Sequence, residues 1–175
     1  MQTFVILFRA INVGGNNKLP MKVLVPLLAK EGFTQIHHYL QTGNVILQSK
    51  ENPTAAVQAL VTQHFNFTPE VISLRAEDFL KAHQQSPFSD TNGKFIHFYF
   101  CKHQASLVLD KLDKYLAESE QYAFINNIFY LHAPEGIGRS KFVTHIESCL
   151  GSPATGRNLN TINKISAMLT SNLEG

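Results

Sequence analysis

The chain has 175 residues, of which 15 are basic, 13 are acidic and two are cysteines, and its formal net charge is +2. With 44% hydrophobic and 16% charged residues, the composition excludes a disordered or fibrous protein. The small net charge requires neither a nucleic acid nor a membrane surface as partner, and no apolar run approaches the ~20 residues of a bilayer span. We expect a cytoplasmic protein without membrane association, in which Cys101 and Cys149 stay reduced.

Hydrophobic spacing and turn residues divide the first 75 residues into alternating strands and helices. Pro20 suits the first turn of a helix that stops at Gly32, and Asn52 can cap a second helix. In chain order we expect a strand over 3–8, a helix over 20–31, strands over 35–41 and 45–48, a helix over 53–65 and a strand over 69–74. This β-α-β-β-α-β order is the ferredoxin-like arrangement.

The remaining residues nearly repeat this order. We expect a helix from about 76, a boundary loop over 86–93, a strand over 94–101, a helix over 104–116, a hairpin of strands over 122–125 and 128–131, a helix over 141–150 capped by Ser140, and a helix over about 159–170. A terminal helix therefore stands where a fourth strand would complete the repeat.

We predict an α+β fold of two ferredoxin-like halves, each with an antiparallel sheet and helices packed on one face, and an extra C-terminal helix. Residues 1–75 form the first half, 76–93 a connecting helix and loop, and 94–175 the second half with the C-terminal helix. The first half holds six basic and three acidic residues, against nine and ten in 76–175. An anionic partner should therefore meet the first half, or individual loops rather than the whole surface.

Three of the four arginines lie in or beside glycine-containing segments. The first loop, residues 9–17, joins a buried strand to a helix, and its glycines leave backbone N–H groups open to an anion. Its candidate ligand residues are Arg9, Asn12, Gly14, Gly15 and Asn16. The loop matches no nucleotide-binding fingerprint, and the alternative is a tight turn in which asparagine side chains bond their own backbone.

Two later segments repeat this combination of glycine, arginine and a helix start. In the second loop, residues 134–141, Arg139, Ser140 and Lys141 can hold a phosphate or carboxylate, or Ser140 simply caps a helix. In the third segment, residues 154–161, the candidates are Arg157, Asn158 and Asn160. Arg157 equally suits tying a loop to carbonyl groups or pairing with a buried acid, and Asn158 can cap the last helix.

Four ordered motifs resemble the bacterial domain-of-unknown-function 1697 family: residues 9–17 with 19–22, the hairpin 39–45, residues 136–141 and residues 155–161. The resemblance spans essentially the whole chain and implies a small cytoplasmic α+β protein. It implies no established activity, substrate or catalytic residue. Two departures from the family pattern are Ala10, where a glycine is usual, and Leu159, where a tryptophan is usual.

Other classes of site have weaker support. The strand over 94–101 alternates Phe95, His97 and Tyr99 with Phe98 and Phe100, so both faces are apolar and core packing is favoured over an RNA-binding platform. No RNP1 motif, H-E-x-x-H motif or cysteine pair occurs, so we predict no metal site, and no cofactor is indicated. No residue can be nominated as catalytic.

The favoured hypothesis is a non-catalytic binding module for a phosphate-bearing ligand, either a nucleic acid or a phosphorylated metabolite, held by the glycine, asparagine and arginine loops. One alternative is an enzyme acting on a small anionic substrate between the two halves, with His38 or His132 as acid or base. The other is a homodimeric protein–protein interaction unit that associates through the aromatic strand 95–100.

Overall fold

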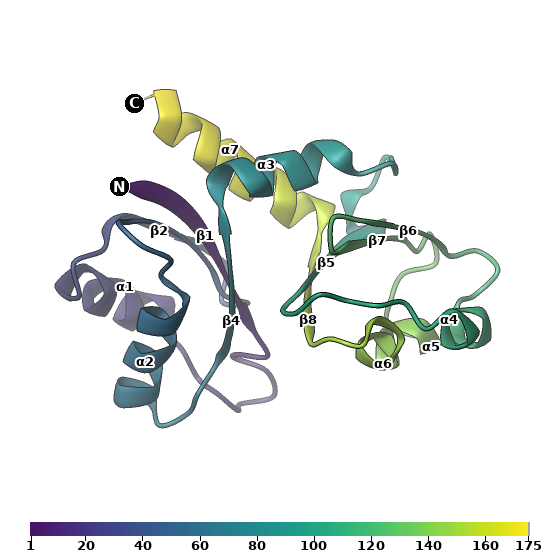
Figure 1. Cartoon of the computed structure of the whole chain (residues 1–175), viewed down its shortest axis with the longest axis horizontal. Coiled ribbons are helices and arrows are strands. Elements are labelled where there is room, and N and C mark those ends of the chain that lie inside the picture. Colours follow the sequence, from purple (N-terminus) through teal and green to yellow (C-terminus); the bar gives the residue numbers. More distant parts are fainter. Residues whose placement is uncertain (175) are drawn as a thin grey trace. The chain divides into compact units, whose positions relative to one another are not determined.

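A computed structural model describes the backbone of residues 1–174 and the side chains of residues 1–171 (Figure 1). The chain divides into two compact units. Unit 1 comprises Met1–Lys81 together with the segment that starts at Ala167, and unit 2 comprises Ala82–Ser166. The two boundaries fall within two helices, α3 (Ala76–Gln85) and α7 (Leu159–Glu174).

Unit 1 is built on a four-stranded antiparallel sheet with strand order β2-β3-β1-β4. Its central strand β1 places Phe4 opposite Leu47 on one side and opposite Arg75 on the other. In chain order the elements are β1 (Gln2–Arg9), α1 (Met21–Lys30), β2 (Thr34–Tyr39), β3 (Asn44–Ser49), α2 (Thr54–Phe65) and β4 (Glu70–Arg75).

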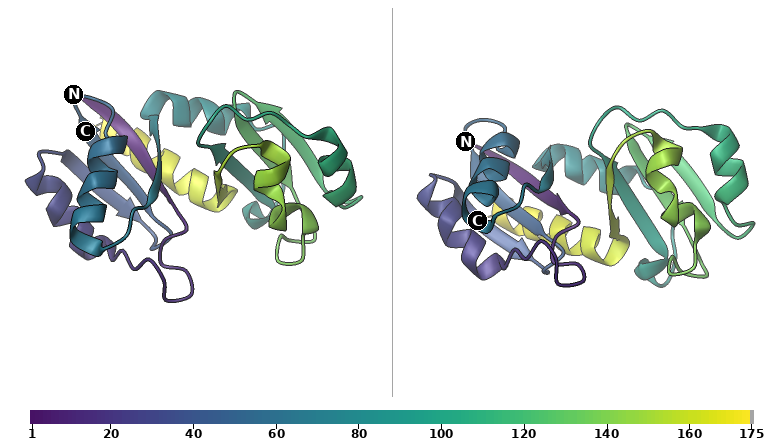
Figure 2. Two further views of the ribbon diagram at one scale, coloured as in Figure 1. Left: turned by 60° about the horizontal axis from the view of Figure 1, so that its bottom comes forward. Right: turned by 90° about the horizontal axis from the view of Figure 1, so that it is seen from below.

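The apolar run of β1 matches the burial of this strand on both faces of the sheet. Phe4, Ile6 and Phe8 pack in one core with residues of α1 and α2, which lie over the same face of the sheet (Figure 2). Val5 and Leu7 point to the opposite face and are also completely buried. The sequence of a strand that is covered on both sides is continuously hydrophobic instead of alternating between apolar and polar residues, as it is here.

Unit 2 has the same topology, with strand order β6-β7-β5-β8. The two units share the β-α-β-β-α-β order and the strand order, and the predicted α+β fold class with two antiparallel sheets and a C-terminal helix is confirmed. In chain order its elements are the 3-10 turn η1 (Gly93–Phe95), β5 (Ile96–Cys101), α4 (Leu109–Tyr115), β6 (Gln121–Ile125), β7 (Ile128–His132), α5 (Lys141–Thr144), α6 (Ile146–Leu150) and β8 (Ala154–Asn158), followed by α7.

The prediction that a terminal helix replaces the fourth strand is wrong. Strand β8 pairs with β5, with Arg157 opposite Phe98, and α7 begins at the next residue after the strand. The segment contains Gly156 between two polar residues, and it therefore lacks the alternating apolar pattern by which a strand is recognised. Its pairing with the aromatic strand β5 overrides its weak local preference.

Two predicted helices are shorter than expected. The helix predicted over 104–116 reduces to α4, because the preceding backbone bonds to another element: Ser106 N–H donates to Leu150 O at 3.0 Å. The helix predicted over 141–150 is split into α5 and α6 at His145, whose backbone leaves the helical region (φ −109°, ψ 14°). Both differences come from tertiary hydrogen bonding and backbone geometry that a hydrophobic pattern does not report.

The aromatic strand β5 is not available for dimerisation. It is paired on both edges, with β7 and with β8, and all six of its residues are buried. A central, covered strand presents neither a free edge nor an exposed aromatic face to a second copy, which argues against the alternative of a homodimer through residues 95–100.

Candidate functional site

The first loop is a small, internally bonded hairpin. Asn12 N–H donates to Asn17 O (3.0 Å), and Asn16 N–H donates to Val13 O (2.9 Å). The two residues at the tip, Gly14 and Gly15, have φ of 58° and 77°, which is the conformation of a two-residue type I′ turn. The tip is exposed. Because both tip residues are glycines, only backbone groups are available to a ligand there.

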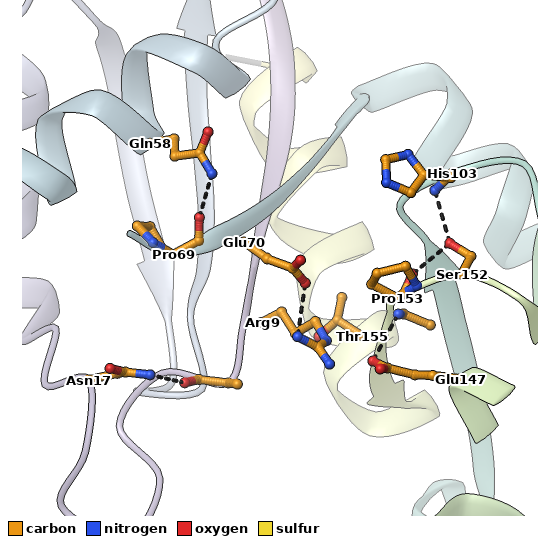
Figure 3. A network of polar contacts seen from close by, with 12 residues as sticks. Arg9, Asn17, Gln58, Pro69, Glu70, His103, Glu147, Ser152, Pro153 and Thr155 are labelled. Atoms are coloured by element: carbon orange, nitrogen blue, oxygen red, sulfur yellow. Dashed lines mark hydrogen bonds and ion pairs between the residues drawn. The ribbon is translucent and has the colours of Figure 1, made fainter. Parts of the chain in front are cut away.

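Asn12 links this loop to the neighbouring turn, and its side-chain amide is used for hydrogen bonds within the fold. Its Nδ2 donates to Leu19 O (3.0 Å) and to Gln41 O (2.6 Å), and its Oδ1 accepts from Leu19 N–H (2.7 Å). Asn17 Nδ2 donates in the same way to Ala10 O at 3.2 Å (Figure 3). These side chains satisfy backbone groups of the loop, which matches the alternative of a tight turn held by asparagine.

Gly43 shows why the first two motifs of the family resemblance belong together. Its φ is +95°, and a methyl group at this position would lie 2.6 Å from Ile11 Cδ1 and 2.7 Å from Phe8 Cβ. Phe8 N–H also donates to Gly43 O at 3.0 Å. Only glycine therefore allows the turn to approach the first loop, and the two motifs form one packed structure.

Arg9, the cation of the first loop, is paired with an acid. Its Nη1 donates to Glu70 Oε2 at 2.8 Å, and both side chains are about two-thirds buried (Figure 3). A guanidinium that already binds a carboxylate has less capacity for a second anion.

The second loop is different, because its cations have no acidic partner among the described residues. Arg139 and Lys141 are exposed, and neither forms an ion pair with another residue in the described part of the chain. Ser140 lies between them with its hydroxyl engaged: Oγ accepts from Val143 N–H (3.2 Å) at the start of α5 and donates to Glu120 Oε2 (2.7 Å). The loop thus presents two free cations on a backbone held by Ser140.

A polar cluster of His97 and Tyr99 lies on one face of the sheet of unit 2. His97 is 6% exposed, and its Nε2 has no hydrogen-bond partner in the described part of the chain. Burial lowers the pKa of His97, while a hydrogen bond to the Lys94 backbone acts in the opposite direction. Burial also raises the pKa of Tyr99, whose ring lies 6.3 Å from that of His97, and the charge of Glu120 adds to that increase.

The third segment holds a buried arginine. Arg157 is 7% exposed, and its Nη1 donates to Thr155 Oγ1 (2.6 Å) and to Gly156 O (2.9 Å). Burial lowers the pKa of Arg157 to about 10, so the guanidinium remains charged at neutral pH. These contacts match the alternative in which Arg157 ties its own segment to protein oxygens.

The other candidates of the third segment also have contacts within the fold. Asn158 Oδ1 accepts from Thr161 N–H at 3.0 Å and so caps α7. The Asn160 side chain packs against Gly93, where any side chain would collide with it. A methyl group on Gly156 would lie 2.6 Å from Tyr99 Cε1, so this glycine makes room for the Tyr99 ring.

A histidine–carboxylate pair lies at the base of the second loop. His132, the last residue of β7, places Nε2 2.8 Å from Asp90 Oδ2, and the two side chains are each 19% exposed. The Asn92 backbone N–H and then His132 hold the pKa of Asp90 below its usual value. His38, the other histidine considered as an acid or base, lies exposed on β2.

The sheet of unit 2 brings together segments that are distant in sequence. His97 lies opposite both Leu131 and Asn158, and Ala133 N–H donates to Phe95 O at 2.9 Å. The start of the second loop and the end of β8 therefore lie on opposite sides of β5, at the end of the sheet where β5 begins, while the first loop belongs to unit 1. The sequence did not predict that His97 and Glu120 lie near this part of the sheet. The strand of His97 was interpreted as core, and Glu120 belongs to no motif that we identified.

The described residues contain no group of three or more His, Cys, Asp or Glu side chains that could hold a metal ion. Among them there is also no helix of the length and hydrophobicity needed to cross a membrane. Cys101 and Cys149 are free and buried, and burial raises the pKa of both thiols, so neither is suited to act as a thiolate nucleophile.

Comparison with known proteins adds a family and a fold. A family model described as "Protein of unknown function (DUF1697)" matches residues 1–130. No curated protein matches the chain significantly. Among solved structures, the conserved bacterial protein SP0830 from Streptococcus pneumoniae is similar, with a TM-score of 0.75 and 21% sequence identity over 96% of this chain and 98% of that protein. At this identity the likeness establishes a shared fold and nothing further.

Proposed function

The chain belongs to the DUF1697 family, whose description assigns no activity, and we propose that it binds a small phosphate-bearing ligand at the second loop, residues 134–141. One observation carries the proposal: Arg139 and Lys141 are exposed cations without an acidic partner in the described residues, whereas Arg9 and Arg157 are engaged by protein oxygens. Arginine and lysine on either side of one residue, here Ser140, can both contact the same phosphate.

A phosphorylated metabolite fits this loop better than a nucleic acid does. Nucleic-acid binding draws its affinity from many phosphate contacts over a broad basic surface. The second loop offers only two cations, with the carboxylates of Glu135 and of Glu120, the acceptor of Ser140, beside them. The aromatic residues of β5 are buried instead of exposed for base stacking. The formal net charge of only +2 for the whole chain does not require an extended anionic partner either.

Isothermal titration calorimetry on the full chain tests this proposal. The probes are inorganic phosphate, a hexose phosphate, adenosine monophosphate and a single-stranded RNA oligonucleotide. Arg139→Ala/Lys141→Ala should weaken binding of the phosphorylated probes at least tenfold, because both proposed contacts are removed. Lys111→Ala/Lys164→Ala is the matched control, since it removes the same charge from exposed positions of the same unit. Equal affinity of the two double variants, or tighter binding of RNA than of every small probe, would overturn the proposal.

His132 and Asp90 favour a second candidate, an enzyme acting on a small anionic substrate at the same loop. A histidine held at 2.8 Å by a carboxylate is the arrangement used for general-base catalysis, and it immediately precedes the loop that carries the two cations. Phosphorus NMR would detect hydrolysis of the bound phosphorylated probe. Turnover that disappears in His132→Gln, with binding retained, would establish this candidate in place of a binding module.

A further inference from the structure

Tyr115 and His145 form a parallel aromatic stack in unit 2. Their ring centres are 4.1 Å apart, and their planes differ by 16°. Tyr115 is the last residue of α4, and His145 lies at the joint between α5 and α6, the two short helices against which α4 packs (Figure 1). The stack therefore fixes the plane of an imidazole that lies one short helix after the second loop.

The two rings of this stack have unequal surroundings. Tyr115 is half-buried, and Lys114 Nζ lies 5.3 Å from the centre of its ring. His145 is exposed, although Tyr115 covers one face of its imidazole. The exposure of His145 therefore belongs to the ring edge and to the opposite face, which we call the outer face. A third aromatic plane can stack on that face.

Lys141, one of the two cations of the proposed phosphate site, lies on the same side of α5 as His145. The His145 backbone N–H donates to Lys141 O at 3.2 Å, so one helical turn separates the two residues. Side chains four positions apart in a helix are neighbours, with Cβ atoms about 5–6 Å apart. The next pair of the same spacing, Phe142 and Ile146, is buried in the core, whereas Lys141 and His145 are both exposed.

A ligand that uses both features carries a phosphate group and a flat aromatic ring at a short distance from it. Nucleobases stack on aromatic side chains, histidine included, whatever their hydrogen-bonding pattern, because every base has a π-face. A hexose phosphate offers the phosphate but no aromatic ring, so it would leave the outer face of His145 unused. The pairing of cations with an exposed, oriented imidazole thus favours a nucleotide among the small phosphorylated metabolites.

We propose that the second loop and His145 together bind a nucleoside monophosphate. The phosphate lies against Arg139 and Lys141, and the base stacks on the outer face of His145, extending the pair with Tyr115 to a column of three rings. This inference rests on the phosphate site proposed above and adds the class of ligand to it.

Calorimetric titration of the full chain with inorganic phosphate, ribose 5-phosphate and adenosine monophosphate tests the ligand class. Adenosine monophosphate should bind at least fivefold more tightly than ribose 5-phosphate, because only the nucleotide has a base to stack on His145. Equal affinities of these two probes, both lost in Arg139→Ala/Lys141→Ala, would overturn this inference and leave the phosphate site standing. Absence of binding by all three probes would overturn the phosphate site and this inference with it.

Variants of His145 test the stacking contact. His145→Ala should weaken adenosine monophosphate at least fivefold and leave ribose 5-phosphate unchanged, whereas His145→Phe keeps a ring and should retain nucleotide affinity within twofold. His103→Ala is the matched control, since it is an exposed histidine of the same unit beyond the end of β5 that lies away from the second loop. It should leave all affinities unchanged. His145 is exposed, so its variants should fold, and a thermal melt checks this.

Equal losses of nucleotide affinity in His145→Ala and His145→Phe, or in His145→Ala and His103→Ala, would contradict the stacking contact. NMR provides a direct readout at saturation with adenosine monophosphate. Nuclear Overhauser effects should join adenine H2 or H8 to the ring protons of His145. Such effects to other aromatic residues, with none to His145, would place the base elsewhere and overturn the inference.

Discussion

The first and second loops both join a strand to a helical segment and both combine glycine with arginine, yet they use these residues differently. In the first loop, Asn12 makes three hydrogen bonds inside the fold and Arg9 binds Glu70. In the second loop, Arg139 and Lys141 have no acidic partner within the described residues. The same residue types therefore serve folding in one place and are available for recognition in the other, and only the contacts of each side chain distinguish the two.

The largest effect should come from Gly43, on which the packing of the first loop depends. Gly43→Ala places a methyl group 2.6 Å from Ile11 Cδ1 at a φ of +95°, so we expect a loss of about 2–4 kcal/mol of unfolding free energy from strain and overpacking. Gly14→Ala is the control: its φ is also positive, but it has no neighbour within 4 Å, and it should cost about 1–2 kcal/mol. Denaturant unfolding of both variants measures the difference, and equal losses would show that the close approach is unimportant.

Removal of the Asn12 side chain should have the next largest effect. Asn12→Ala leaves the Leu19 N–H and two carbonyl groups without their partner, at a cost of about 1–3 kcal/mol. Asn16→Ala, at the exposed tip of the same loop, should change stability by less than about 0.5 kcal/mol. Phosphate affinity of Asn12→Ala, measured under conditions where it is folded, should equal that of the wild type. A selective loss of affinity would move the ligand site to the first loop.

His97 tests the polar cluster on the face of the unit 2 sheet. Because its Nε2 is buried and has no partner in the part of the chain that the structure describes, His97→Leu should raise the free energy of unfolding at neutral pH by about 1 kcal/mol. The pKa of His97 is lowered in the folded state, so the unfolded chain binds the proton first and the wild type loses stability as pH falls below 6.5. The variant should lose this part of the pH dependence. Unfolding curves at pH 7.5 and 5.5 measure it, and identical pH profiles would contradict a buried neutral imidazole.

Substitution of Asp90 should have the smallest effect on stability, and it tests the histidine–carboxylate pair at the base of the second loop. Its pKa is lowered in the folded state, so its contribution to stability is present above the ordinary value of 3.8 and is lost as pH falls through the folded-state pKa. Asp90→Asn should flatten the acid side of the stability profile, where the pH falls through 3.8 and below. A wild-type slope in Asp90→Asn would mean that the pairs with Asn92 and His132 contribute nothing.

Hydrophobic spacing was sufficient to predict both βαββα frameworks, because β1 and β5 are long apolar runs and the Asn126-Asn127 turn is a strong local signal. The two asparagines indeed have φ of 51° and 64°. Strand β8 was not predictable in this way, since Gly156 and Arg157 break the apolar alternation and the strand depends on pairing with β5.

The sequence predicted which residue types occur in the candidate loops, but it did not predict whether each side chain binds a ligand or stabilises the fold. Arginine beside glycine is compatible with an anion site or with an internal tie, and the difference depends on partners distant in sequence, such as Glu70 for Arg9 and Glu120 for Ser140. A buried group such as His97 gave no local signal, because its neighbours in sequence are those of a core strand.

A phosphate titration followed by 1H–15N NMR on the full, isotopically labelled chain tests the central claim most directly, since it observes both loops in one experiment. We predict saturable shifts of the amides of Gly136, Gly138, Arg139, Ser140 and Lys141, their loss in Arg139→Ala/Lys141→Ala, and unchanged amides at Gly14 and Gly15. Saturable shifts confined to the first loop, or no saturable shift in either loop, would contradict the account.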